Sequence, residues 1–231
     1  MYLKQVKDVL TLYGGLIILK VIMETKYQNL INYIQEQISD GQLGPGEKVP
    51  SENQLSEQFH ISRQTVRKAI GTLEEDGLVC GTPNAGYELR QPTIAELCEI
   101  YELREALEGL AIERTIRTGV PPELLKELRQ ACELRRNSSV NGELEAGDFA
   151  FHRAICRHCG SAALRGIIDN TLLLSTVFAV APKLFRADRG RTDREHEAIV
   201  QAVADGDAKR ARRLLTNHIA AARKRLEKLA K

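Results

Sequence analysis

The sequence of 231 residues has no tryptophan, only 5% aromatic residues, and few runs of strand-forming side chains. This scarcity argues against a β-sandwich and favours a helical protein. The net charge is only +2, which is too small to indicate a nucleic-acid partner. Binding to nucleic acid would have to depend on local patches of positive charge. A chain of this length can bury one large core or two smaller ones, and we interpret it as two domains.

Dense cysteine and long hydrophobic runs are also missing. The five cysteines are scattered and odd in number, unlike the framework of a small secreted protein, and reduced thiols in a cytoplasm are expected. The longest uncharged run near the start, Val9–Leu19, is too short to span a bilayer, and Lys20 interrupts it with no small-residue cleavage site after it. We therefore expect a cytoplasmic protein with no membrane partner. Residues 1–22 are interpreted as an extension of uncertain role, upstream of a start at Met23 or packed on the protein.

Residues 23–90 have the pattern of a winged helix-turn-helix domain. Apolar residues at helical spacing predict a first helix over Tyr27–Asp40, and a loop rich in Gly and Pro follows. A capping box from Ser51 to Gln54 predicts a short second helix through Phe59. Ser62 is expected to cap a third helix, which ends near Glu75, Asp76 and Gly77. The segment LVCGTPNAGYEL then predicts a two-stranded wing.

Residues 91–231 are predicted to be an all-α bundle of about six helices. Gly, Pro and capping residues separate the predicted helices, and a polar loop, NSSVNG, follows the second of them. The predicted ranges are Ile94–Thr118, Pro122 to about Arg136, Glu143–His158, Ala162–Val180, Asp193–Ala204 and Ala208–Lys228. The expected fold class is therefore mainly α, a winged helix-turn-helix of three helices and a small β-hairpin followed by a helical bundle.

The third helix, ISRQTVRKAI and onward, places cations beside an apolar stripe of Val66, Ile70 and Leu73. The stripe anchors such a helix to its neighbours, while its first turn can enter the major groove. An arginine suits guanine, a glutamine suits adenine, and a hydroxyl suits a phosphate or a thymine methyl. The residues of this chain with that chemistry are Ser62, Arg63, Gln64, Thr65 and Arg67, with Lys48 in the preceding loop as a phosphate contact.

An ordinary solvated helix with a few cations is the alternative. Residues 24–90 contain ten acidic and six basic side chains, a net charge of −4, so DNA affinity has to come from an asymmetric distribution. The acidic residues Glu74, Glu75 and Asp76 cluster at the far end of the third helix. Helix periodicity alone leaves the two interpretations open.

The stretch from KYQNLINYIQEQISDG to TVRKAIGTLEEDGLV resembles, over its whole length, the winged-helix domain of GntR-family bacterial transcription regulators. The resemblance implies that Arg63, Arg67 and Asn53 contact DNA. We also include Ser51 in the predicted DNA-binding set. Asn53 departs from the fatty-acid-responsive branch, which has arginine there. The wing, CGTPNAGYEL, also lacks the usual Arg and Gly-rich tip, so its contact with the minor groove is not implied.

Four of the five histidines fall in the predicted bundle. Asp148 and His152 are four residues apart and share one helix face, and His196 and His218 lie on two further predicted helices. If these side chains converge, they suit Zn²⁺ or another divalent ion, although spacing alone does not show convergence. A rival thiolate set adds Cys156 and Cys159 to His152, but a reduced cysteine on a helix is most often a small buried hydrophobe.

Residues from about Ile94 to Ile219 resemble the FCD effector domain of the FadR branch of the same family, through YELREALEGLAIE, DFAFHRAI, EHEAIVQAVADGD and LLTNHI. The resemblance implies that Asp148, His152, His196 and His218 are metal ligands, for Zn²⁺ first and for Ni²⁺ or Mn²⁺ as alternatives. It also places Arg104 near the effector pocket, where a small carboxylic acid is sensed. The alternative for Arg104 is an ion pair with Glu108 on the helix surface.

The sequence therefore predicts a regulator that binds double-stranded operator DNA as a homodimer, with a small organic acid controlling its affinity through the metal-bearing domain. Repression relieved by the ligand is expected by analogy. A metal-dependent hydrolytic enzyme is the alternative from another class, but no separate general base stands at recognisable spacing, so we expect no enzyme. A metal or ligand sensor that has lost DNA binding is a third interpretation.

Overall fold

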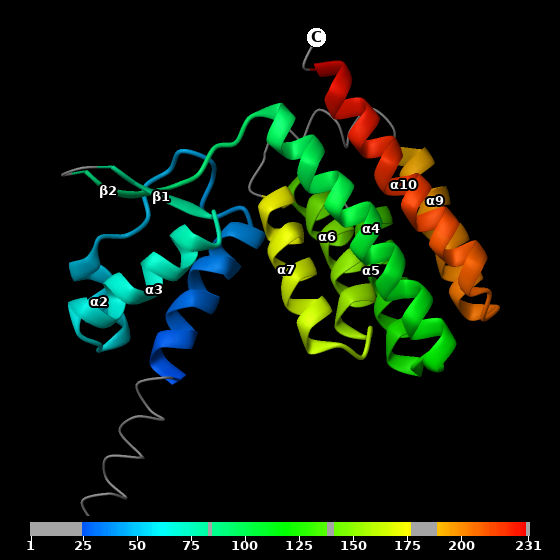
Figure 1. Ribbon diagram of the computed structural model, residues 1–231, viewed down its shortest axis with the longest axis horizontal. Coiled ribbons are helices and arrows are strands. Elements are labelled where there is room, and N and C mark those ends of the chain that lie inside the picture. Colours follow the sequence, from blue (N-terminus) through cyan, green and yellow to red (C-terminus); the bar gives the residue numbers. More distant parts are fainter. Residues whose placement is uncertain (1–24, 83–84, 138–140, 177–188, 230–231) are drawn as a thin grey trace, which may run out of the picture. The chain divides into compact units, whose positions relative to one another are not determined.

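The computed structural model describes residues 25–82, 85–137, 141–176 and 189–229 (Figure 1). The chain divides into two compact units, one of Met1–Gln37 with Lys48–Glu88 and one of Ile38–Glu47 with Leu89–Lys231. Most of the described residues are helical, as the low aromatic content predicted. Among them, no helix has both the length and the hydropathy needed to cross a bilayer.

The first unit has the predicted winged helix-turn-helix. A helix over residues 25–39 is followed by α2 (Glu52–Phe59), α3 (Arg63–Glu75) and a hairpin of β1 (Val79–Thr82) and β2 (Gly86–Leu89). Ser51 and Gln54 form the predicted capping box of α2, and the Ser62 side chain accepts from the Thr65 amide to cap α3. His60 ends α2 with φ 51°, which makes the sharp turn between the two helices.

Burial in this unit follows the predicted apolar stripe. Val66, Ile70 and Leu73 of α3 are buried and share the core with Leu30 and Leu55. Burial of this stripe holds α3 to its neighbours, so its opposite side remains exposed.

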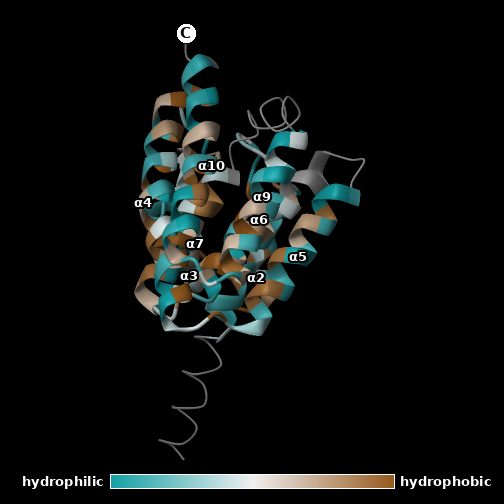
Figure 2. Ribbon diagram, turned by 90° about the vertical axis from the view of Figure 1, so that its right-hand side faces the viewer, coloured by the Kyte–Doolittle hydropathy of each residue, from teal (hydrophilic) through white to brown (hydrophobic). Residues whose placement is uncertain are grey.

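The second unit is the predicted helical bundle. Its helices are α4 (Ile94–Thr118), α5 (Pro122–Asn137), α6 (Asn141–Arg157), α7 (Ala162–Thr176), α9 (Arg189–Ala204) and α10 (Ala208–Leu229). Each of these helices carries both apolar and polar residues, coloured brown and teal in Figure 2. The long helix α4 packs against α10, α7 and α6, while α9 packs against α5 and α10.

Small residues bring these helices close together. A Cβ added at Gly109 of α4 would lie 2.8 Å from Thr216 Cγ2 of α10, and one at Gly147 of α6 would lie 3.0 Å from the Arg135 backbone nitrogen of α5. Larger side chains at either glycine would push the helices apart. Gly147 directly precedes Asp148, so the close approach of α6 to α5 also seats that carboxylate.

Two helix starts differ from the predictions. Helix α6 includes Asn141 and Gly142, the last two residues of the predicted loop NSSVNG, because first-turn amides need no intrahelical partner and Asn and Gly are tolerated there. Residues 138–140 of that predicted loop lie outside the described residues. Helix α9 begins at Arg189, four residues before the predicted Asp193. Arg189 donates to the carbonyls of Arg135 and Arg136, a tertiary contact that periodicity does not show. The predicted end of α7 at Val180 lies outside the described residues.

Candidate metal centre and nucleic-acid interface

Four side chains from three helices of the second unit converge on one point. Asp148 and His152 come from α6, His196 from α9 and His218 from α10, and all four are buried. One ligand atom of each lies within 4.8 Å of those of the other three. The structure therefore brings together all four residues of the predicted metal set.

The imidazoles turn their Nε2 atoms toward one another and toward the carboxylate. The His196 and His218 Nε2 atoms are 3.3 Å apart, and His196 Nε2 is 3.5 Å from Asp148 Oδ1. His152 Nε2 is 3.9 Å from Asp148 Oδ2. The ring of His196 is held flat by Phe151, which stacks on it with centroids 3.9 Å apart and planes 1° apart.

Two glutamates that sequence reasoning did not select orient two of these rings. Glu108 Oε2 is 2.5 Å from His152 Nδ1, and Glu195 Oε2 is 2.8 Å from His218 Nδ1. An ionised carboxylate can only accept, so each Nδ1 carries a proton, and in the neutral ring the Nε2 lone pair then faces the centre. This is how outer carboxylates prepare histidine for a metal.

The electrostatics favour the protonation states that metal binding needs. Burial lowers the pKa of His196 well below its usual value, and the neighbouring imidazole of His218 adds to this effect. Burial also lowers the pKa of His218. Burial alone would raise the pKa of Asp148, but the imidazoles of His152 and His218 and the guanidinium of Arg135 hold it below its ordinary value. Neutral imidazoles beside an ionised carboxylate are the ligand forms.

The cluster fits a divalent cation. Asp148 Oδ1 is buried with no hydrogen-bond partner among the described residues, an arrangement that costs free energy unless something else satisfies the oxygen. An ion held by that oxygen and the three Nε2 atoms would satisfy it. Three imidazole nitrogens and one carboxylate are a donor set suited to Zn²⁺ and to other divalent transition metals.

The rival cysteine set is less suited to a metal. The Cys156 thiol donates to the His152 carbonyl oxygen at 3.1 Å, and the Cys159 thiol donates to the Ser161 carbonyl oxygen at 3.5 Å. Burial raises the pKa of the Cys156 thiol far above its usual value, which disfavours the thiolate that binds metals. Neither thiol belongs to the cluster of converging donor atoms.

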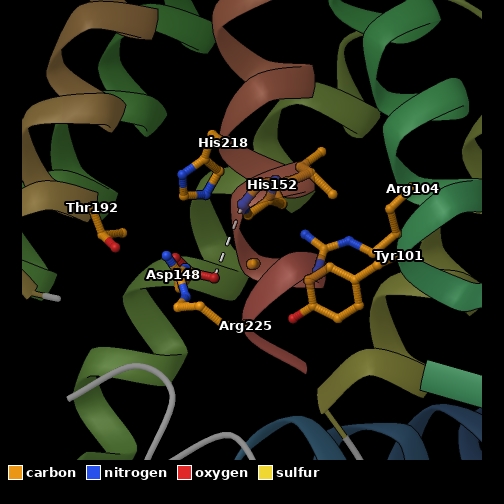
Figure 3. Close-up of a pocket in the computed structure, with 9 residues that line it drawn as sticks. Tyr101, Arg104, Asp148, His152, Thr192, His218 and Arg225 are labelled. Atoms are coloured by element: carbon orange, nitrogen blue, oxygen red, sulfur yellow. Dashed lines mark ion pairs between the residues drawn. The ribbon is translucent and has the colours of Figure 1, made fainter. Parts of the chain in front are cut away.

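A small cavity lies beside the cluster (Figure 3). Side chains from α4, α6, α9 and α10 point into it, and the free space suits about one water molecule. Its lining residues are Tyr101, Arg104, Asp148, His152, Thr192, His218, Ile219, Ala222 and Arg225. The cavity therefore joins Arg104, the predicted effector residue, to three members of the metal cluster.

Arg104 is buried, which corrects the alternative of a pair on the helix surface. The predicted pair with Glu108 exists, with Arg104 Nε donating to Oε1 at 2.7 Å, but both side chains are almost fully enclosed. Arg104 also donates to Ser175 Oγ at 3.3 Å and lies over the Tyr101 ring. Burial alone would raise the pKa of Glu108, but Arg104 and His152 lower it to about 2. Glu108 thus stays ionised and links Arg104 to a metal-cluster histidine.

The predicted DNA residues lie in the first unit, around the start of α3. Arg63, Gln64 and Arg67 are exposed and Thr65 is half-buried, on the side of α3 away from its apolar stripe. Ser62 caps the helix and its hydroxyl is 2.9 Å from that of Thr65. Ser51 caps α2, where Asn53 is exposed in the first turn.

Acidic partners hold two of the predicted DNA-contact cations. Arg67 donates to Glu52 through two parallel bonds, Nε to Oε1 at 3.0 Å and Nη2 to Oε2 at 2.9 Å. The Lys48 ammonium is 3.1 Å from Glu88 Oε2. Sequence reasoning did not select Glu52 as a partner of this predicted contact residue, because fifteen positions and a turn separate it from Arg67.

Comparison with known proteins identifies both units. Residues 26–89 match the bacterial regulatory proteins of the gntR family, and residues 99–221 match the FCD domain. The HTH-type transcriptional regulator LutR of Bacillus subtilis (strain 168) is 30% identical over 207 residues, which cover 79% of this chain and 92% of LutR. These families and this relative are transcriptional regulators, not enzymes.

Two solved structures share the fold. E. coli McbR/YncC aligns with a TM-score of 0.71 at 19% identity, over 89% of this chain and 99% of that one. A GntR transcriptional regulator from Rhodococcus sp. RHA1 aligns with a TM-score of 0.69 at 23% identity, over 87% of this chain and 97% of that one. The winged helix-turn-helix followed by a helical bundle is therefore a known architecture.

Proposed function

Because this chain belongs to the GntR family of bacterial regulatory proteins and carries an FCD domain, we propose that a small organic acid, bound beside a divalent metal ion, controls its affinity for DNA. Regulators of this family bind DNA operators and usually act as dimers. For this chain the proposed form is a homodimer on a pseudo-palindromic operator, with one α3 helix in each half-site.

The exposed start of α3 supports the proposed DNA contact. Arg63 and Gln64 project from the first turn, where side chains of their length reach base edges in the major groove. The proposed phosphate contacts, Lys48 and Ser51, lie just before α2. Ser62, Thr65, Arg67 and Asn53 complete the proposed contact set.

The convergence of Asp148 with three imidazoles is the observation that carries the effector half of the proposal. These four residues would hold the ion, and Zn²⁺ is the first choice because nitrogen donors dominate the set, with Ni²⁺ or Mn²⁺ as alternatives. When bound, the ion supplies a Lewis acid for the ligand's carboxylate. Arg104, beside the same cavity, would neutralise the remaining negative charge.

The size of the cavity suggests how a ligand acts on the protein. Space for about one water molecule is too small for a carboxylic acid, so the acid must bind a wider arrangement of the lining helices. A ligand shifts a conformational equilibrium by its difference in affinity for the two states. Binding of the acid would therefore change the bundle, and through the linker it would change operator affinity, with relief of repression as the expected sign.

The test is a fluorescence-anisotropy titration of DNA taken from upstream of the protein's own gene. The metal-loaded protein is titrated with and without small carboxylic acids first selected by thermal shift. We expect an effective acid to change operator affinity by about 5- to 150-fold, the range of typical coupling energies. The matched variant is His196→Ala/His218→Ala, in which the effect of the acid is lost while DNA is still bound.

Two outcomes contradict the proposal. Absence of DNA retention at low salt argues against operator binding, because phosphate contacts are strongest there. An equal response to the acid in the double variant argues against a role for the metal.

A further inference from the structure

The outward side of α4 carries apolar residues that the described part of the chain leaves uncovered. Leu103 is 52% exposed and Leu110 is 48% exposed, and they stand seven residues apart, two helical turns along one side. The exposed Ala106 lies between them. Seven-residue spacing of leucines is the pattern of a helix that packs along a second helix.

The same side of α4 is acidic toward its start and basic toward its end. Glu99 precedes the leucines by about one turn, and Arg114 and Arg117 follow them, all exposed. Arg117 is paired with Glu113. Within the described residues, no ion pair engages the side chain of Glu99 or Arg114. A surface with leucines at its centre and opposite charges at its two ends is complementary to itself when turned around.

We propose that α4 pairs with α4 of a second copy of this chain, antiparallel about a two-fold axis between Ala106 and Leu107. This pairing places Leu103 opposite the partner's Leu110 and Glu99 opposite the partner's Arg114. Because the contact is isologous, each pair occurs twice. A parallel pairing would place like charges opposite each other and is disfavoured. The small side chain of Ala106 at the axis allows the two helices to come close.

This surface deepens the proposed function, on whose homodimer it rests, because α4 also carries the buried Arg104 and Glu108. Both are buried, unlike the exposed Leu103 and Leu110, and they reach the cavity and His152. A shift of α4 on ligand binding would thus reach the dimer contact through one rigid helix. The dimer surface would then respond to the same site as the proposed effector.

Sedimentation of the full chain tests the pairing with four variants. We expect Leu103→Glu to convert the dimer to monomer, and Glu99→Arg or Arg114→Glu alone to weaken it by on the order of tenfold or more, since each creates two like-charge contacts. The double variant Glu99→Arg/Arg114→Glu should regain the dimer because opposite charges again face each other. The matched control is Leu134→Glu, at a leucine of α5 that is 44% exposed, which should leave the dimer unchanged.

Every substituted side chain is exposed, and an unchanged circular dichroism spectrum and melting curve of the dilute protein confirms that each variant folds. A dimer that survives Leu103→Glu, or a double variant no tighter than the single ones, overturns the α4 surface. Operator binding and metal content of the wild type are measured on the same preparations. If the wild type binds neither operator nor metal, the proposed function is contradicted. An intact dimer in Leu103→Glu contradicts only the proposed α4 surface.

Discussion

The two units contain the same kind of arginine–glutamate pair in opposite surroundings. In the first unit Arg67 holds Glu52, and their side chains are 68% and 25% exposed. In the second unit Arg104 holds Glu108, and the exposures are 5% and 0%. The donor and acceptor chemistry is the same, so the difference between the pairs is their access to water.

This difference separates an exchangeable contact from a fixed one. Water and salt screen the exposed pair, so a phosphate or a guanine can replace Glu52 as the partner of Arg67 at little cost. The buried pair has no such replacement, because either partner left alone would be an uncompensated charge inside the protein. The exposed pair of the first unit can therefore exchange partners, whereas the buried pair of the second unit keeps its partners and orients a histidine.

Breaking the buried pair has the largest expected effect. Glu108→Ala leaves Arg104 buried without its carboxylate and removes the acceptor of His152, so the free energy of unfolding should fall by about 3 to 5 kcal/mol. Urea denaturation measures the change. Glu52→Ala is the matched control, since loss of an exposed pair should barely alter the unfolding curve. Equal effects of the two substitutions contradict the contrast between the pairs.

Metal removal comes next. If the ion ties α6, α9 and α10 together, a chelator should lower the melting temperature of the wild type, because a ligand at 100 times its Kd stabilises the folded state by about 2.7 kcal/mol. The variant His196→Ala/His218→Ala should contain no metal by elemental analysis and should not respond to the chelator. Full metal occupancy in that variant would indicate that the metal is bound by His152, Cys156 and Cys159 instead.

The exposed arginine at the start of α3 provides a smaller effect of a different kind. Arg63→Ala should weaken operator binding by roughly 1 to 3 kcal/mol and relax base preference, as expected for a lost contact to a base. Arg213→Ala removes the same charge from an exposed position of α10 and is the control. Unchanged footprints for Arg63→Ala, or equal losses in the two variants, argue against a base contact.

The sequence predicted the helices well because their signals are local. The capping box of Ser51 and Gln54, the Ser62 cap and the ends of α4 at Ile94 and Thr118 each depend on a few adjacent residues, and all are present in the structure. The start of α9 at Arg189 was missed, because its contacts come from α5. Local patterns fix where helices form and say less about what their ends touch.

The metal site was harder to predict from local sequence than the helices were. Spacing placed Asp148 and His152 on one helix face, but only the resemblance joined them to His196 and His218. Glu108 and Glu195 could not be selected, because a glutamate on a helix most often faces solvent and nothing local marks a buried one. The useful signal is that each belongs to a segment already carrying a candidate, Arg104 or His196. Orienting partners are properties of helix packing, which a single sequence does not contain.

The smallest effect tests whether Glu52 positions Arg67. Glu52→Gln keeps the size of the side chain and removes its charge, so Arg67 is no longer held in one direction by two bonds. Stability should hardly change, and affinity for random DNA should rise, with a slope against salt steeper by about one phosphate contact. Affinity for the operator should change less, so the ratio of specific to random binding falls severalfold.

Salt titrations of both DNAs, with wild type and variant side by side, measure that ratio directly. Lys68→Gln is the control, because Lys68 is an exposed cation of the same helix, beside the Tyr27 ring and without an acidic partner among the described residues. Its loss should lower affinity for random DNA. Opposite effects of the two substitutions on affinity for random DNA do not by themselves separate the two roles of Glu52. If the specific-to-random ratio falls for Glu52→Gln alone, Glu52 restrains Arg67 and does not merely add a negative charge to the surface. A ratio that falls equally in both variants leaves Glu52 with a purely electrostatic role, because a charge without directional bonds cannot favour one base over another.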